Sequence, residues 1–157
     1  DCLVLGAGGS ARAIVYGLSE AGGRITLVAR RIEQAQQLVA DLGADSVQTI
    51  RPLDRLDDGA AGLEAPLIVN TTPVGMSPHG ERSIWPDDLP FPSGSFVYDL
   101  VYNPPQTRLM HQAEAAGCGT SNGLGMLLRQ GAASFALWTG IEPDLAAMQR
   151  ALVASKG

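Results

Sequence analysis

An apolar run, a glycine-rich turn and an amphipathic segment follow one another at the start of this chain. Residues 3–5 are Leu-Val-Leu, residues 6–10 are Gly-Ala-Gly-Gly-Ser, and residues 11–18 have helical spacing of apolar side chains. In such a strand–turn–helix unit, Gly6 permits the tight turn and Gly8 lets backbone N–H groups approach a pyrophosphate, while Ala11 allows close packing of helix on strand. The unit predicts a dinucleotide-binding turn, and a βα turn without ligand is the alternative.

Composition limits the other classes of function. The 157 residues, 45% of them hydrophobic, fit one domain over residues 1–157. A net charge of −5 argues against nucleic acid as a partner, and no apolar run is long enough to cross a membrane. The start of the chain lacks the pattern of a signal peptide. Cys2 and Cys118 are far apart in sequence and lie in apolar segments, so we expect reduced thiols and a cytoplasmic protein.

Strand-like and helix-like segments alternate along the whole sequence. Strands are predicted at residues 2–5, 24–29, 46–50, 67–71, 96–101 and, weakly, 118–121, and helices at 10–21, 32–42, 106–116, 124–139 and 143–154. This alternation predicts an α/β fold with a doubly wound parallel sheet of the Rossmann type, three layers deep in a single domain. Residues 73–94, rich in Pro, Gly, Ser and Asp, are predicted to form a long loop of functional importance after the fourth strand.

The end of the second predicted strand indicates which dinucleotide is bound. NAD-binding folds place an acidic residue there to accept from the ribose 2′-hydroxyl. This chain instead has Arg30 and Arg31, and no acid appears before Glu33. Because a guanidinium pairs with a 2′-phosphate through charge-assisted hydrogen bonds, we expect NADP (NADPH) rather than NAD. The alternative is a pair of solvated surface arginines.

Three further segments carry a resemblance to a known family. Residues 70–76 are Asn-Thr-Thr-Pro-Val-Gly-Met, residues 98–104 are Tyr-Asp-Leu-Val-Tyr-Asn-Pro, and residues 122–132 are Asn-Gly-Leu-Gly-Met-Leu-Leu-Arg-Gln-Gly-Ala. Together with residues 6–13, the chain resembles the carboxy-terminal, NADP-binding domain of the shikimate dehydrogenase family. The likeness extends over essentially all 157 residues.

The resemblance implies a set of site residues. The positions matching the family's pyrophosphate turn are Gly6, Ala7, Gly8, Gly9 and Ser10. Leu100 and Gly123 match backbone positions at the nicotinamide end, and Tyr102 and Gln130 match the substrate-contacting tyrosine and glutamine. The family usually has Asn-Arg-Thr after the second strand and another arginine further on, whereas this chain has Ala29-Arg30-Arg31 and then Gln34.

The residues themselves support part of this assignment. Asn70, Thr71, Thr72 and Tyr102 follow the carboxyl ends of predicted parallel strands, where open α/β sheets bind ligands. Gln130 lies two helical turns beyond Gly123 on one side of the helix. A packing role remains open for Tyr102 and Gln130.

Other notable residues have plainer interpretations. Asp99 lies within an apolar strand, which favours a structural hydrogen-bonding role over acid–base work. His79 and His111 have no partner pattern, and we expect no metal site. Helical spacing predicts that five residues belong to the core: Leu124, Leu127, Leu128, Phe135 and Trp138.

The resemblance also implies what this chain lacks. The family transfers hydride between NADP(H) and shikimate or 3-dehydroshikimate, in aromatic amino-acid (chorismate) biosynthesis, and a lysine paired with an aspartate in the amino-terminal substrate domain handles the proton. The chain's one lysine is Lys156, near its end. We therefore expect no catalytic residue in this chain, an absent substrate domain as its partner, and no activity of the chain alone.

Two other functions and one association remain open. A relative acting on quinate with NAD or NADP is one alternative, and a stand-alone dinucleotide-binding module without catalysis is the other. A homodimer is a further expectation, because Leu145, Met148, Leu152 and Val153 recur at helical spacing and would leave an apolar face.

Overall fold

The computed structural model describes residues 1–154, except for the side chain of Val153. The chain forms two compact units, one from Asp1 to Asn122 and the other from Gly123 onward. Lys156 lies outside the described residues. None of the helices in the described part is long and apolar enough to cross a membrane.

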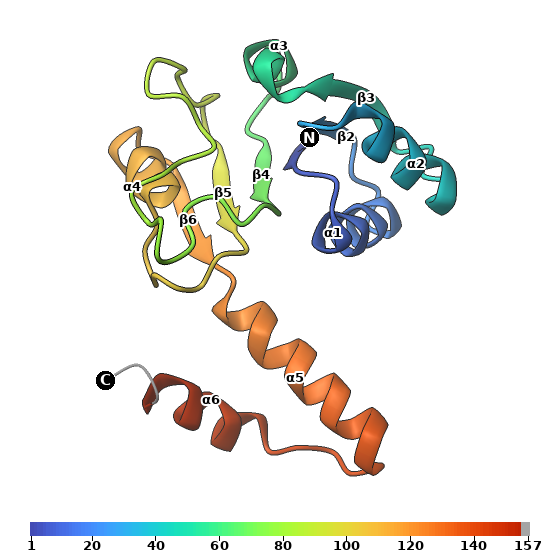
Figure 1. Ribbon diagram of the computed structural model, residues 1–157, viewed down its shortest axis with the longest axis vertical. Coiled ribbons are helices and arrows are strands. Elements are labelled where there is room, and N and C mark those ends of the chain that lie inside the picture. Colours follow the sequence, from blue (N-terminus) through green and yellow to red (C-terminus); the bar gives the residue numbers. More distant parts are fainter. Residues whose placement is uncertain (155–157) are drawn as a thin grey trace. The chain divides into compact units, whose positions relative to one another are not determined.

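The first unit is built on a parallel sheet of six strands (Figure 1). In chain order, the strands are β1 (Cys2–Leu5), β2 (Ile25–Ala29), β3 (Val47–Pro52), β4 (Leu67–Asn70), β5 (Phe96–Asp99) and β6 (Gly119–Asn122). Their order in the sheet is β3-β2-β1-β4-β5-β6, so the winding reverses between β1 and β4. This is the order of a doubly wound dinucleotide-binding fold.

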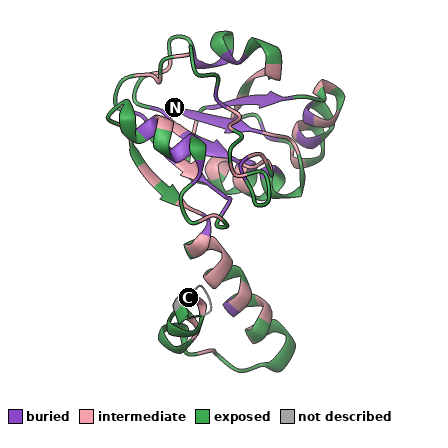
Figure 2. Ribbon diagram, turned by 60° about the vertical axis from the view of Figure 1, so that its left-hand side comes forward, coloured by how far each residue is buried: buried purple, intermediate pink, exposed green. Residues whose placement is uncertain are grey.

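Helices cover the two faces of this sheet with separate cores. One core joins Val4 and Leu27 to α1 (Gly9–Glu20) and α2 (Ile32–Leu42) through Val15 and Leu38. The other core joins Leu3, Leu5, Ile68 and Val97 to α3 (Leu56–Ala60) and α4 (Arg108–Ala115). Alternate residues of β1 therefore belong to opposite cores, as expected for a strand buried on both faces. Figure 2 shows the buried strands between exposed helical surfaces. The predicted fold class, a three-layer α/β sheet, is confirmed.

The structure adds one helical segment that the sequence did not predict and confirms the long loop. A short 3-10 turn at Leu53–Arg55 and helix α3 follow β3, where no helix was expected. The segment predicted as a loop, residues 73–94, is indeed without helix or strand, but Trp85 is buried within the second core.

The second unit contains α5 (Leu124–Thr139) and α6 (Leu145–Ala154), which contact each other. The expectation that five side chains of α5 belong to the core is wrong: Phe135 and Trp138 are 41% and 85% exposed, and Leu124, Leu127 and Leu128 are only half-buried. Helical spacing places apolar side chains on one face, but it does not supply an element to cover that face.

Candidate functional site

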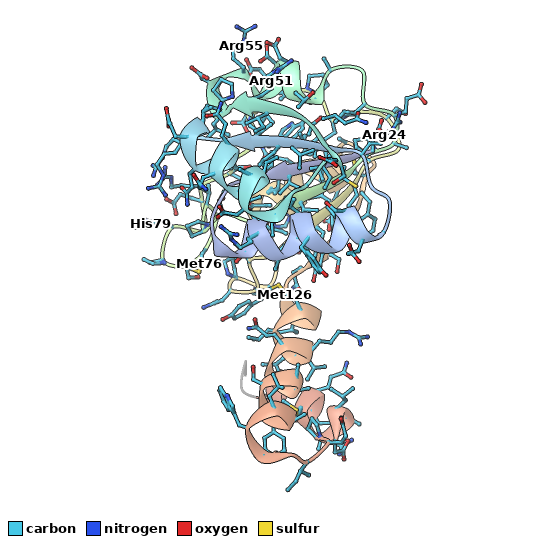
Figure 3. The ribbon with its side chains drawn as sticks, turned by 90° about the vertical axis from the view of Figure 1, so that its right-hand side faces the viewer. Arg24, Arg51, Arg55, Met76, His79 and Met126 are labelled. Atoms are coloured by element: carbon cyan, nitrogen blue, oxygen red, sulfur yellow. The ribbon has the colours of Figure 1, made fainter. Side chains whose placement is uncertain are left out.

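A cavity of about 270 Å³ lies at the carboxyl ends of β1, β2 and β4. Its lining comes from three separate segments and two single side chains: Gly6–Gly8, residues 28–31 with Gln34, residues 71–74, Leu53 and Ile84. The cavity therefore lies where the strand order reverses, which is the place where open α/β sheets bind ligands. Figure 3 agrees with this polarity, because Met76, in the loop after β4, lies at the opposite end of the sheet from Arg24, which precedes β2.

The glycine turn has the geometry that close approach of a ligand requires. Gly6 has a φ of +112°, and a Cβ there would lie 2.6 Å from Thr71 Oγ1 and 2.9 Å from Thr72 Cγ2. By contrast, a Cβ on Gly8 or Gly9 would meet no atom within 4 Å, so the space in front of the turn is open. No side chain caps the N-terminus of α1 at Gly8. The first N–H groups of a 12-residue helix are thus available to an anion, and the helix dipole favours one there.

Two arginines line the cavity at the end of β2. Arg30 and Arg31 follow β2 directly, line the cavity and are exposed. Within residues 1–154 neither forms an ion pair, whereas Arg12, Arg24, Arg55 and Arg108 each pair with an aspartate. These two free cations give this end of the cavity a positive charge.

The wall formed by residues 71–74 is held to β1 and β4. Thr71 Oγ1 donates to the carbonyl oxygen of Leu5 at 2.7 Å. Thr72 donates to Asn70 Oδ1 through its N–H at 3.0 Å and through its hydroxyl at 2.7 Å. Asn70 itself is fully buried and does not line the cavity.

Asp99 lies at the end of β5 as a fully buried carboxylate. It accepts hydrogen bonds from Asn70 Nδ2 at 2.9 Å, the N–H of Val101 at 3.0 Å and Thr107 Oγ1 at 2.7 Å. Burial raises the pKa of Asp99 above its ordinary value, although the three hydrogen bonds act in the opposite direction. The predicted structural hydrogen-bonding role is therefore confirmed.

The other expected site residues occupy varied positions. Leu100 is buried after β5 and its N–H donates to the carbonyl oxygen of Asn70, while Tyr102 is 36% exposed. Gly9 and Ser10 form the exposed first turn of α1. Gly123 and Gln130 belong to the second unit, where Gly123 precedes α5 and Gln130 is exposed.

Seven lining residues were not among the expected site residues: Val28, Ala29, Gln34, Leu53, Pro73, Val74 and Ile84. Val74, Leu53 and Ile84 give the cavity apolar surface. Val74 lies within the motif at residues 70–76, so the motif could have indicated it. Leu53 and Ile84 come from the 3-10 turn and the long loop, and no sequence pattern marks either. Apolar walls of this kind suit a flat ring of a ligand.

Comparison with known proteins agrees with this geometry. The family model described as "Shikimate 5'-dehydrogenase C-terminal domain" matches residues 123–153. A shikimate dehydrogenase (NADP(+)) of Salinibacter ruber is 43% identical over 141 residues, which cover 87% of this chain and 50% of that protein. One from Rhodopseudomonas palustris is 47% identical, with 96% and 52% covered. The chain belongs to the shikimate dehydrogenase family.

Solved structures show the same relationship. The Thermus thermophilus shikimate 5-dehydrogenase in complex with NADP(H) and shikimate has a TM-score of 0.78 and 37% identity, with 98% of this chain and 54% of that one covered. The quinate dehydrogenase of Corynebacterium glutamicum in complex with NAD has a TM-score of 0.83 and 28% identity, with the same coverage. This member of the shikimate dehydrogenase family spans about half the length of the curated relatives it matches.

Proposed function

We propose that residues 1–157 are the NADP-binding domain of a shikimate dehydrogenase, which reduces 3-dehydroshikimate to shikimate with NADPH. One observation carries the proposal: the glycine turn and the two free arginines line a single cavity at the switch point of the sheet. A dinucleotide needs both features, because its pyrophosphate and its 2′-phosphate are separate anions.

The residues present fit such a ligand. Gly6, Ala7, Gly8, Gly9 and Ser10 would hold the pyrophosphate, because their backbone is open where Gly8 and Gly9 lack a Cβ. Arg30 would pair with the 2′-phosphate and Arg31 would support it. Since β4 lies on the other side of β1 from β2, the nicotinamide half would lie toward Thr71 and Thr72. By the family resemblance we assign Leu100 to the same half and Tyr102 to the substrate, and the family roles of Gly123 and Gln130 stay predictions.

The chemistry of the reaction is divided between this domain and another. NADPH supplies the hydride, and this chain's residues bind and orient it. Asp99, the buried carboxylate near the site, already accepts three hydrogen bonds, so we do not assign it proton transfer. We propose that an amino-terminal substrate domain supplies the acid–base pair and that the enzyme works in the cytoplasm, where the free thiols of Cys2 and Cys118 stay reduced.

Titration of the 157-residue chain with NADPH, followed by nucleotide fluorescence, tests the proposal. We expect saturable binding and no oxidation of NADPH by 3-dehydroshikimate. Gly8→Asp should abolish binding, because the side chain fits the open space but places a negative charge against the phosphates. Gly17→Asp puts the same charge further along α1, also in open space, and should bind as the wild type does. Equal affinity of the two variants would contradict the proposal.

A second candidate is a quinate-oxidising relative that uses NAD. The TM-score of 0.83 to the quinate dehydrogenase in complex with NAD favours it. Gln34 favours it as well, because it lines the cavity in place of the second arginine that the family usually has for the 2′-phosphate. The ratio of NADPH to NADH affinity distinguishes the two cofactors. Turnover of shikimate against quinate, measured on a longer protein that includes an amino-terminal domain, distinguishes the substrates. If the chain is instead a dinucleotide-binding module without catalysis, it would bind the nucleotide, and a longer protein that contains it would turn over neither shikimate nor quinate.

A further inference from the structure

A continuous series of side-chain hydrogen bonds joins the N-terminus of α4 to the cavity. Thr107 caps α4 by accepting from the N–H of Met110, and its hydroxyl donates to Asp99 Oδ2. Asp99 Oδ1 accepts from Asn70 Nδ2, and Asn70 Oδ1 accepts twice from Thr72. Four residues from β4, β5 and the segments that follow them are thereby connected.

Burial makes this series rigid. Asn70, Asp99 and Thr107 each have no exposed surface, so none of them can exchange a lost partner for bulk water. A buried polar group that loses its partner carries its full desolvation cost, and hydrogen bonds to an ionised carboxylate are stronger than neutral ones. The position of Asn70 is thus tied to that of Asp99.

The series ends at the glycine turn. Thr72 Cγ2 lies 2.9 Å from the place where a Cβ on Gly6 would be, so this methyl group packs directly on the turn. Thr72 Oγ1 also accepts from the N–H of Val74, another residue of the cavity lining, at 3.3 Å. Displacement of Thr72 would therefore remove its methyl group from the glycine turn and would also shift Val74 in the cavity wall.

We propose that Asn70 and Asp99 are positioning residues of the cofactor site: they fix Thr72 against the glycine turn without touching the ligand. Asn70 is buried and uses both ends of its amide within the protein, so its contribution passes through Thr72. A second branch runs from Asp99 to the N–H of Val101, so the same carboxylate also fixes the segment that leads to Tyr102. This inference rests on the proposed function, because it assigns roles within that binding site.

Asp99→Ala and Asp99→Asn form the test pair. Alanine removes the acceptor of Asn70 and Val101, whereas asparagine retains an Oδ1 in the same place. We expect Asp99→Ala to weaken NADPH binding about tenfold, equivalent to the loss of one hydrogen bond, and Asp99→Asn to stay within about threefold of the wild type. Thr120→Val, which removes the hydrogen bond from Thr120 on β6 to Glu114 on α4, should leave the affinity unchanged.

A shorter nucleotide separates positioning from general damage. Adenosine 2′,5′-bisphosphate would lie toward Arg30 and Arg31, on the opposite side of β1 from Thr72. Its affinity should be unchanged in Asp99→Ala. Loss of affinity for both ligands alike, or for neither, would overturn the inference while leaving the proposed function intact.

A ligand-free measurement keeps the two proposals distinguishable. The N–H of Thr72 bonds to Asn70, not to Asp99, so its hydrogen exchange reports whether the effect travels along the series. We expect faster exchange in Asp99→Ala and rescue in Asp99→Asn, even if the wild type binds no nucleotide. Should Asp99→Ala fail to fold, Thr107→Val with Thr107→Ser as the rescue variant applies the same test from the α4 end. Unchanged Thr72 exchange in these variants would refute the positioning role.

Discussion

Arg30 and Arg31 differ in what each is expected to contribute to cofactor choice. Both line the cavity and neither forms an ion pair within residues 1–154. Only Arg30 occupies the central position of the family's usual Asn-Arg-Thr pattern. The sequence predicted both arginines as cofactor-binding residues, because their side-chain type and their distance in sequence from the glycine turn are enough to identify them. It could not predict Leu53 or Ile84, whose place in the lining depends on how distant segments pack.

Arg30→Asp should reverse the cofactor preference. A hydrogen bond to a charged group contributes about 1.5–3 kcal/mol, so NADPH affinity should fall about 10- to 150-fold. NADH affinity should be kept or improved, because the carboxylate can accept from the ribose hydroxyls. Arg31→Ala should have a smaller effect. Calorimetric titration of both variants with both cofactors at one salt concentration measures this, and equal losses for the two cofactors would place the 2′-phosphate elsewhere.

Asp99 also predicts a pH dependence of stability. Its folded-state pKa is raised by burial, so the folded chain holds this proton more tightly than the unfolded chain does. The group therefore favours folding most below its unfolded pKa, and that contribution is lost as the pH rises through the raised folded value. The side chain introduced by Asp99→Asn does not titrate in this pH range, so the variant does not lose this contribution. Urea unfolding at a series of pH values should show the variant gaining stability relative to the wild type as the pH rises.

Asp87 provides a control of opposite sign. The hydrogen bond from Arg108 lowers the pKa of Asp87, so its contribution is present above the unfolded pKa and is lost as the pH falls. Asp87→Asn should therefore lose stability relative to the wild type as the pH rises. If the stability of Asp99→Asn and of Asp87→Asn relative to the wild type changed with pH in the same direction, Asp99 would not titrate as its burial implies.

At the scale of elements, tertiary packing explains the features that the local sequence pattern did not predict. Helix α3 has only five residues, three of them Asp or Gly, and it packs where Gly59 leaves room beside Val28. The loop over residues 73–94 has loop composition, yet α4 holds it: Arg108 bonds to Asp87 and to the carbonyl oxygen of Glu81. The strands around the glycine turn were predictable because each is a continuous apolar run.

Trp85 should be the main anchor of that loop. It is 2% exposed, its ring stacks on Phe91 at 4.4 Å between centroids, and its Nε1 donates to the carbonyl oxygen of Leu89. Trp85→Ala should lower the free energy of unfolding by about 3–5 kcal/mol in urea titrations. Trp85→Phe keeps the stacking and should cost about 1–2 kcal/mol. A loss below about 1 kcal/mol in Trp85→Ala would show that the loop does not depend on this side chain.

At the scale of the whole molecule, the second unit leaves much apolar surface exposed. Among the described residues, its exposed large hydrophobic side chains are Phe135, Leu137, Trp138, Ile141 and Leu145, and Leu137 and Trp138 are 84% and 85% exposed. Several large apolar side chains exposed within residues 135–145 are typical of an interaction surface. The sequence placed all of these side chains except Ile141 on helices, but it could not indicate what covers them. Either a further domain or a second copy of the chain can do so.

The isolated chain should therefore self-associate. Sedimentation velocity should show the weight-average mass rising with concentration, because burying these side chains on a second copy removes apolar area from water at about 25 cal/mol per Å². Leu137→Gln with Trp138→Gln should shift the association to higher concentration by at least tenfold. Tyr16→Gln, which removes an aromatic ring that is 58% exposed on α1, should leave it unchanged. A single monomeric species at all concentrations would mean that this surface is shielded within one chain, and an equal response of both variants would mean that association uses another face.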